Sequence, residues 1–426
     1  MPYQKCETEV LKVRKNPDSS SSLICEKLFL GMTFGKYLKS NLTLFNVISA
    51  IILVIAIPVM IYRLVYGLGP STNLSDTNPW GIWIGVDVLC GIALAAGGLV
   101  IGTAYYLFGM KEYRHFVRPA ILTSLLGYIF AVFALLFDLG RYYRLPYPMV
   151  VSFGLSSIMF LIAWHFALYI LALLIEWSPA LFEWLNMQKL RQWFSKLAIW
   201  ATAFGVIIAG GHQSALGALF IIAPGKLHPL WYSELLPVFF LISAIIAGLS
   251  MVIIESALTH KVFKKQVEHF DKVDFDRLTI GLGKAASAAL FTYFFLKLFG
   301  LAHSHNWDLL STTYGYWFLV EVLGFVFSPA FLFAYGVRHR DVKVVRWTAL
   351  LTVIGVVLNR INTSIIAFNW NAPERYYPMW TEVVITIGVV TMGVLTFRWI
   401  VNRMAILYDH PQYGETREKN LDTTTI

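Results

Sequence analysis

The chain is poor in charged residues and in cysteine. Only 14% of its 426 residues are charged, against about a quarter in soluble globular proteins. The three cysteines, Cys6, Cys25 and Cys90, form no CxxC or CxxCH pattern, so iron–sulfur ligation, c-type haem attachment and a disulfide framework are unsupported. Walker A, HExxH and GxSxG sequences are also missing. These absences argue against a soluble, self-contained enzyme.

The chain is rich in apolar residues. They make up 57% of the chain, and the mean hydropathy is +0.63. A run of about 20 apolar residues is long enough to cross a bilayer as a helix. We expect such helices over ten segments: 42–66, 81–109, 117–140, 149–177, 197–222, 234–259, 277–302, 313–336, 344–367 and 381–402. The predicted fold class is all-α, a polytopic integral membrane protein with an N-terminal tail 1–41, a transmembrane helical domain 42–402 and a C-terminal tail 403–426.

The distribution of Lys and Arg predicts the orientation. They are concentrated in the N-terminal tail and in the loops after the second, fourth, sixth and eighth segments, whereas the opposite loops hold only Arg141, Arg144, Lys226 and Arg375. Because cytoplasmic loops carry the excess of basic residues, both termini are expected in the cytoplasm and the chain in the cytoplasmic (inner) membrane as a multi-pass protein. This asymmetry and contact with anionic lipid explain the net charge of +9. Nothing calls for a nucleic acid partner.

Six ionisable residues lie inside the apolar segments, and all six fall in or near the predicted outer half. A charge at the centre of a spanning helix costs roughly 2.5 to 3.5 kcal/mol, so such residues pair with one another or line a cavity. We expect them to form a polar chamber that opens near the outer face. The six are Asp87, Asp138, His212, Glu321, Arg360 and Glu382. Helix rise places Glu321 and Arg360 at similar depths, as a buried charge network in which Arg360 neutralises a carboxylate.

Asp138 has two interpretations. It could simply pair with Arg141, three residues later. Alternatively, its position at the outer end of the third segment suits exchange of protons between a buried site and water. The sequence leaves both open.

A histidine beside carboxylates, covered by aromatic rings, suits a quinone. The quinone headgroup needs hydrogen-bond partners for both ring oxygens and a proton route to water, which His, Asp and Glu supply. An ordinary interfacial belt also accounts for many of the aromatic residues. The expected quinone-binding and proton-exchange residues are Asp138, His212, Asp87, Arg141, Tyr142, Gln213, Trp231 and Glu382. His165, Glu176 and Glu255 could continue a proton path inward, and no residue is expected to bind a metal.

An ordered set of motifs over residues 45–405 resembles one family. The motifs are Pro79-Trp80-Gly81 with Asp87, Val117-Arg118-Pro119-Ala120, Asp138-Leu139-Gly140-Arg141-Tyr142, Ser178-Pro179-Ala180-Leu181-Phe182-Glu183, His212-Gln213-Ser214, His228-Pro229-Leu230-Trp231, Glu255, Ala367-Phe368-Asn369 and Pro378-Met379-Trp380-Thr381-Glu382. They resemble the NrfD/PsrC (polysulfide reductase) membrane subunits, most closely the HybB-type subunits of hydrogenase and quinone reductase complexes.

The resemblance implies a haem-free subunit that binds menaquinone or a similar quinone and depends on partner proteins. It would exchange electrons between the quinone pool and an iron–sulfur, ferredoxin-like subunit on the outer face, with or without proton translocation. A hydrogenase, a molybdoenzyme-like protein or a multihaem cytochrome would complete the complex. The longest loops, 67–80, 260–276 and 368–380, are too short to hold a domain, which agrees with this dependence.

Two other functions compete with this interpretation. A b-type cytochrome needs two axial histidines at one depth, but the expected helices put His165 about 24 Å and His212 about 15 Å below the outer surface. A proton-coupled secondary transporter usually has helices broken at matching places in two halves. Pro58, Pro237 and Pro329 mark no such pair.

Overall fold

The structure is a computed structural model that describes residues 27–267 and 274–408. Within these residues, ten helices are long and apolar enough to cross a membrane, which confirms the predicted class and the ten expected segments. Seven of them are single helices: α4 (Leu44–Tyr66), α7 (Arg114–Asp138), α9 (Ile158–Trp184), α10 (Gln188–Ile221), α11 (Leu236–Val262), α13 (Phe275–His303) and α17 (Trp380–Val401). Helices satisfy every backbone hydrogen bond within one segment, as a hydrocarbon environment requires.

The other three spans are assembled from shorter pieces. The second contains η2 (Trp83–Cys90), α5 (Gly91–Leu94), α6 (Gly97–Gly102) and η3 (Thr103–Leu107); the eighth contains α14 (Thr313–Leu319), η8 (Val320–Phe327) and α15 (Ser328–Arg338); the ninth contains α16 (Val342–Ile361) and η9 (Asn362–Ile366). The third span begins with η4 (Lys111–Tyr113), directly before α7. Short helices outside the spans are α3 (Phe34–Ser40), η1 (Gly69–Ser71), η5 (Tyr142–Arg144), α8 (Tyr147–Val150), α12 (Lys264–Val267) and η7 (Asn306–Ser311).

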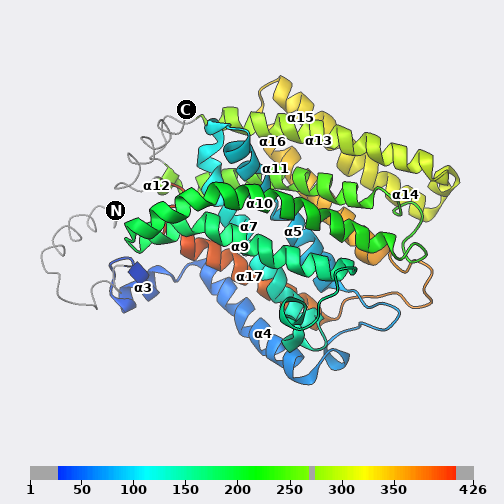
Figure 1. Ribbon diagram of the computed structural model, residues 1–426, viewed down its shortest axis with the longest axis horizontal. Coiled ribbons are helices and arrows are strands. Elements are labelled where there is room, and N and C mark those ends of the chain that lie inside the picture. Colours follow the sequence, from blue (N-terminus) through cyan, green and yellow to red (C-terminus); the bar gives the residue numbers. More distant parts are fainter. Residues whose placement is uncertain (1–26, 268–273, 409–426) are drawn as a thin grey trace, which may run out of the picture.

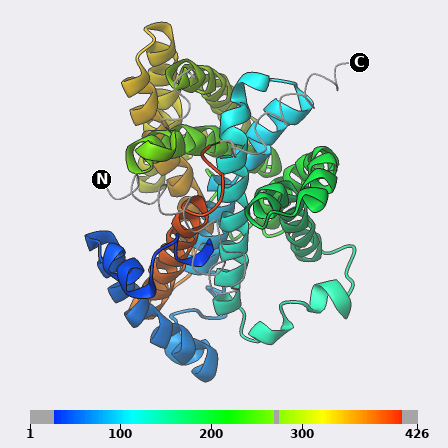
Figure 2. The ribbon, with the colours of Figure 1, turned by 90° about the vertical axis from the view of Figure 1, so that its left-hand side faces the viewer.

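The second span and α11 form the centre of the bundle. About 72% and 61% of their apolar windows are buried, whereas α4 and α17 bury only 22% and 28%. Figure 2 looks along the helices and shows α4 and α17 side by side at one edge, α9 and α10 at another, and α13 with α15 and α16 at a third. Central helices can therefore carry polar groups that never meet lipid.

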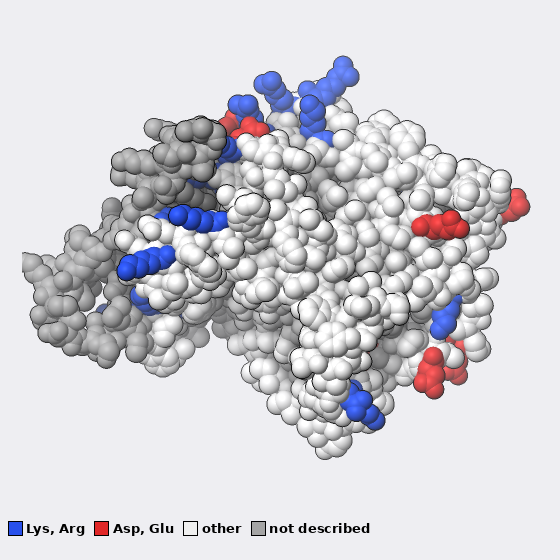
Figure 3. All heavy atoms as spheres, viewed as in Figure 1, with Lys and Arg blue, Asp and Glu red and all other residues white. Residues whose placement is uncertain are grey.

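The two ends of the bundle differ in charge. We name the end where α4 begins and α17 ends the terminal face. There a hydrogen bond of 3.1 Å from Arg398 Nη1 to Asn46 Oδ1 joins the two helices. Connections 67–82 and 367–379 lie at the other end, named the opposite face (Figure 1). Lys and Arg gather toward the terminal face in Figure 3, in agreement with the predicted cytoplasmic side. The orientation in a membrane stays a prediction.

The fourth span begins later than expected. Residues 149–157 are not its first turns, because α8 ends at Val150 and the Ser157 side chain caps α9 by accepting from the Phe160 N–H at 3.4 Å. Apolar residues in this stretch made it indistinguishable from a helix by hydropathy. His165 is consequently seven residues into the span, about 10 Å, instead of mid-membrane.

This shift removes the predicted difference in depth between the two intramembrane histidines. His212 lies nine residues before the end of α10, about 14 Å from that end. The His165 ring also packs on Gly211, where an added Cβ would lie 3.2 Å from its Cε1 atom. The expectation of separate levels was wrong.

Four π-helical segments, η2, η3, η8 and η9, interrupt the spans within the described chain. Three of them hold buried polar side chains: Asp87 in η2, Glu321 in η8 and Asn362 in η9. A π-bulge adds a residue to a turn and re-aims its side chain, and such bulges are frequent at functional sites. The local winding therefore turns these groups toward the interior.

Candidate functional site

The structure places most of the predicted site residues in three buried clusters instead of one chamber, whereas Arg141 and Tyr142 are exposed. The carboxylate cluster, near the opposite face, comprises Arg63, Asp87, Asp138, Tyr376 and Glu382. The histidine cluster comprises Tyr128, His165, Tyr169, His212 and Gln213. The glutamate network comprises Trp231, Lys297, Glu321, Asn359, Arg360 and Asn362.

Glu382 anchors the carboxylate cluster. Its fully buried carboxylate accepts from the Met379 N–H at 2.7 Å, which caps the start of α17. It also accepts from the Tyr376 hydroxyl at 2.6 Å. That hydroxyl in turn accepts from the Ile82 N–H at 3.1 Å, and burial raises the pKa of Tyr376, so the phenol stays protonated. Glu382 thereby holds connection 367–379 against the start of the second span.

Asp138 lies next to Arg63, not next to Arg141. The Arg63 guanidinium is fully buried and donates from Nε to the Phe137 carbonyl and from Nη2 to the Leu139 carbonyl, both at 2.8 Å. It is the positive charge that acts on Asp138. Arg141 is exposed and forms no ion pair with Asp138 in the part of the chain that the structure describes. The simple pairing of Asp138 with Arg141 was therefore wrong.

Two atoms of this cluster have unused hydrogen-bonding capacity. Asp138 Oδ1 and Arg63 Nη1 are buried, and neither has a hydrogen-bond partner among the described residues. Most buried polar atoms are hydrogen-bonded, so an acceptor and a donor left over in one cluster indicate a place for a polar ligand or water. Asp87, on η2, lies beside α17 one helical turn deeper than Glu382. Its Oδ2 accepts there from the Thr386 hydroxyl of α17 at 2.7 Å.

The histidine cluster is enclosed by aromatic rings. His212 is fully buried, and its Nδ1 lies 3.0 Å from the Ile208 carbonyl. Because that carbonyl can only accept, Nδ1 carries the proton, and Nε2 accepts from the Tyr128 hydroxyl. Gln213 donates from Nε2 to the Ile92 carbonyl at 3.3 Å. Gln213 Oε1 and His165 Nδ1 are buried without a partner in residues 27–267 and 274–408.

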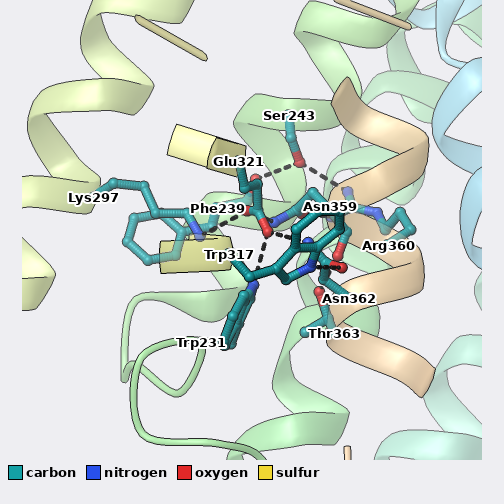
Figure 4. A network of polar contacts seen from close by, with 10 residues as sticks. All are labelled: Trp231, Phe239, Ser243, Lys297, Trp317, Glu321, Asn359, Arg360, Asn362 and Thr363. Carbon is teal, nitrogen blue, oxygen red and sulfur yellow. Dashed lines mark hydrogen bonds and ion pairs between the residues drawn. The ribbon is translucent and has the colours of Figure 1, made fainter. Parts of the chain in front are cut away.

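The glutamate network is the most completely bonded of the three (Figure 4). Glu321 Oε2 accepts from the Trp231 indole at 2.8 Å, and Oε1 accepts from Asn359 Nδ2 at 2.7 Å. Asn362 Nδ2 donates to Oε2 at 2.5 Å. Lys297 Nζ lies 3.7 Å from Oε1 and supplies the positive charge. Trp231 thus belongs to this network and is not beside Asp138.

The similar depths predicted that Arg360 neutralises a carboxylate, but Arg360 does not contact Glu321 directly. Its Nη2 donates to the Ser243 hydroxyl at 2.8 Å and to the Phe240 carbonyl at 3.1 Å. Nη1 donates to Asn359 Oδ1 at 3.2 Å, so Asn359 stands between the guanidinium and the carboxylate. Arg360 also lies over the Phe240 ring at 3.7 Å.

The predicted proton-path residues fall on two lines. Tyr169 lies between His212, at 5.7 Å between ring centroids, and Glu176, with which it interacts electrostatically. Glu176 packs against Gly205 toward the terminal face. Glu255 is separate, on α11, and accepts from the Thr123 hydroxyl at 2.7 Å. Only His165, His212 and Glu176 follow one another along neighbouring helices.

Sequence reasoning missed Arg63, Lys297 and Tyr128. The two cations lie near the ends of apolar runs, where a long basic side chain normally reaches the interface. Both are instead buried, at 0% and 7% exposure. Tyr128 sits within an apolar run and carried no signal of its own. No group of three or more His, Cys, Asp or Glu able to hold a metal occurs among the described residues.

These features define a class: a polytopic membrane protein whose central helices bury ionisable groups. Comparison with known proteins agrees. The model of the family "Polysulphide reductase, NrfD" matches residues 70–369. The chain is 49% identical over 379 residues to a protein of Nitratidesulfovibrio vulgaris, covering 88% of this chain and 98% of that one.

Two relatives carry informative names. The probable Ni/Fe-hydrogenase 2 b-type cytochrome subunit of Escherichia coli is 32% identical over 372 residues, which is 86% of this chain and 93% of the relative. The Hdr-like menaquinol oxidoreductase integral membrane subunit of Archaeoglobus fulgidus is 25% identical over 240 residues, which is 56% and 57% of the two chains. The chain belongs to the NrfD family of membrane subunits.

Proposed function

We propose that the chain is the quinone-reactive membrane subunit of a respiratory oxidoreductase complex. In this role it exchanges electrons between a menaquinone-type pool and an iron–sulfur partner. The observation that supports it best is the buried donor and acceptor left over in the carboxylate cluster, Arg63 Nη1 and Asp138 Oδ1. The names of two relatives, a hydrogenase subunit and a menaquinol oxidoreductase subunit, support the same role.

The residues present fit a quinone. When bound, a quinone supplies a carrier of two electrons and two protons, and each ring oxygen needs a hydrogen-bond partner. Arg63 Nη1 is a donor with fixed charge, suited to an oxygen that gains electron density. Asp138 Oδ1 is a buried proton acceptor, and the residue as a whole is only half-buried, so Asp138 can pass that proton toward water. Exposed Arg141 and Tyr142 lie just beyond it on the opposite face.

The other predicted residues have supporting roles in this proposal. Asp87 and Glu382 hold α17 against the second span and surround the site with negative charge. Gln213 and His165 offer further unpartnered polar atoms deeper in the bundle. His212, Tyr169 and Glu176 form the proposed inward proton path, with Glu255 as a separate branch. Glu321 and Arg360 maintain the fold of the other half.

We also infer the docking side of the partner from the location of the carboxylate cluster. The cluster lies near the opposite face, where α7 ends and α17 begins, so electrons reach it over the shortest distance from an iron–sulfur, ferredoxin-like subunit bound to that face. With the terminal face in the cytoplasm, this partner is on the outer side of the inner membrane. Hydrogenase, molybdoenzyme-like or multihaem cytochrome subunits then attach through the iron–sulfur protein.

The proposal is tested by Asp138→Asn in the assembled complex, with Arg141→Gln as the matched control. Asn keeps the shape but cannot take up a proton, so quinone-linked turnover should fall at least a hundredfold, the usual contribution of a general base. Arg141→Gln should keep turnover within about twofold, since exposed charges contribute little. Near wild-type turnover with an unchanged pH profile in an assembled Asp138→Asn complex would reject the role of Asp138.

A second candidate, a b-type cytochrome subunit, has two observations in its favour. His165 and His212 lie on neighbouring helices at similar depth, and the Escherichia coli relative is named a b-type cytochrome subunit. Both ring nitrogens of His212, however, already bond to Tyr128 and Ile208, so ligation would break one of these contacts. An optical spectrum of the purified complex distinguishes the two, because haem in this subunit would give a Soret band that disappears in His212→Ala.

A further inference from the structure

A cavity of about 530 Å³ opens toward the terminal face, away from the three clusters. It lies between the start of α7, the end of α9, the start of α10 and η3. Its polar wall carries Arg118, Arg191 and Lys196, and its apolar wall carries Ile121, Trp177 and Ile199. The cavity is separate from the proposed quinone site and shares only Glu176 with the proposed inward proton path.

Positive charge is in excess in the outer part of the cavity. Glu183 forms ion pairs with Arg118 at 2.7 Å and with Arg191 at 2.9 Å, so one carboxylate serves two guanidinium groups. Lys196 is exposed and has no ion pair within the described residues. The other lining carboxylate, Glu176, lies seven residues before Glu183 on α9, about 10 Å nearer the bundle centre. Among the described lining residues, the outer part therefore has two more cations than anions.

The lining changes from polar to apolar in the direction of the membrane. Along α10 the lining residues run Arg191, Gln192, Ser195 and Lys196, and then Ala198 and Ile199. Trp193, on the same helix, is 61% exposed, as is typical of a tryptophan at the boundary between headgroups and hydrocarbon. A ligand that fits both walls has an anionic head and an apolar tail.

We propose that this cavity binds one anionic phospholipid, with its phosphate at Arg191 and Lys196 and its upper acyl chains against Trp177 and Ile199. Basic pockets between spanning helices bind anionic headgroups because several cations there replace the hydration of the phosphate. A quinone fits less well, since its neutral headgroup gains nothing from the surplus positive charge. The inference is independent of the quinone site and would hold if the chain had another activity.

The test compares lipid binding by the purified full-length chain in a neutral detergent, using native mass spectrometry. Phosphatidylglycerol and phosphatidylcholine with identical acyl chains are titrated against wild type, Lys196→Gln and Lys189→Gln. Lys189 is the matched control, because it is exposed on the same helix two turns earlier and does not line the cavity. Lys196→Gln should weaken phosphatidylglycerol binding about fivefold, equal to about 1 kcal/mol for one basic side chain, and Lys189→Gln should leave it unchanged.

Two further measurements test the site itself. Ser195→Trp fills the cavity without changing charge and should abolish retention of the first phosphatidylglycerol. Glycerol phosphate, the same anionic group without acyl chains, should compete only weakly; full displacement at millimolar concentration would show a free-phosphate site instead. Equal binding of the two lipids, equal effects of the two lysine variants, or displacement of the lipid by a short-chain naphthoquinone would each overturn the proposal.

Discussion

Glu321 and Lys297 form a buried ion pair whose removal should strongly destabilise the bundle. The carboxylate has an exposed fraction of 1% and the lysine side chain 6%, with 3.7 Å between Nζ and Oε1. Glu321→Gln removes the negative charge and keeps the size of the side chain. Among the described residues it leaves Lys297 without an ion-pair partner, next to the rings of Phe239, Tyr293 and Phe318 at 5.3 to 5.7 Å.

The loss of unfolding free energy in each variant depends on the partners that remain for the other charge. Removing one member of a buried pair costs about 3 to 5 kcal/mol, because the other charge stays desolvated. Lys297→Met should cost less than Glu321→Gln, since the carboxylate keeps its hydrogen bonds from Trp231, Asn359 and Asn362. Combining the two substitutions removes both charges, so the double variant should be about 2 kcal/mol more stable than the sum of the single effects predicts.

Unfolding by SDS titration in mixed micelles, followed by tryptophan fluorescence, gives these free energies. Trp231 donates to the carboxylate and provides a local signal. A matched control is Lys343→Met, because Lys343 is exposed at the start of α16. The reasoning is refuted if Lys297→Met destabilises as much as Glu321→Gln and the double variant shows simple additivity, since the two charges would then be energetically independent.

Three further predictions concern other parts of the molecule. Glu382→Ala should cost about 2 kcal/mol or more in unfolding free energy, because it removes a helix cap and leaves the O–H of Tyr376 without its acceptor. Glu382→Gln should cost less, and equal losses would contradict the capping role. Gly217→Ala should prevent normal packing of α10 against α11, because the added Cβ would clash with the Leu236 backbone carbonyl. The Cβ of Gly210→Ala meets nothing within 4 Å, so this variant should be neutral or slightly stabilising. Purification yields and unfolding midpoints of the two variants test this. Burial lowers the pKa of His228, whose ring stacks on Tyr314 at 4.5 Å between centroids. The stability that neutral His228 contributes is therefore present above the unfolded pKa of about 6.5 and is lost as the pH falls below that value. The unfolding midpoint should drop between pH 7.5 and 5, and by less in His228→Gln; an equal drop in both proteins would contradict this role of His228.

The hydropathy of the sequence determined the class and the number of spans. Runs of about 20 apolar residues in lipid have one way to satisfy their backbone, so each run becomes a helix. The rarity of charge in those runs also identified Glu321, Glu382 and Asp138 as special, because a buried charge is too costly to keep without a partner. Helix boundaries were harder to predict. The fourth helix begins at Ile158 and not at 149, and the sequence could not show this, because an apolar interfacial stretch has the same hydropathy as the first turn of a helix.

Only the tertiary structure decided which groups meet. Arg63 and Asp138, or Lys297 and Glu321, lie on different helices, and their positions along the sequence give depth in the bundle but not the direction in which a side chain points. The direction depends on how each helix is rotated and on π-helical turns such as η2 and η8, which re-aim Asp87 and Glu321. Helix rotation is set by packing against all neighbouring helices at once, so the partner of a buried charge is a property of the folded bundle and not of any segment alone.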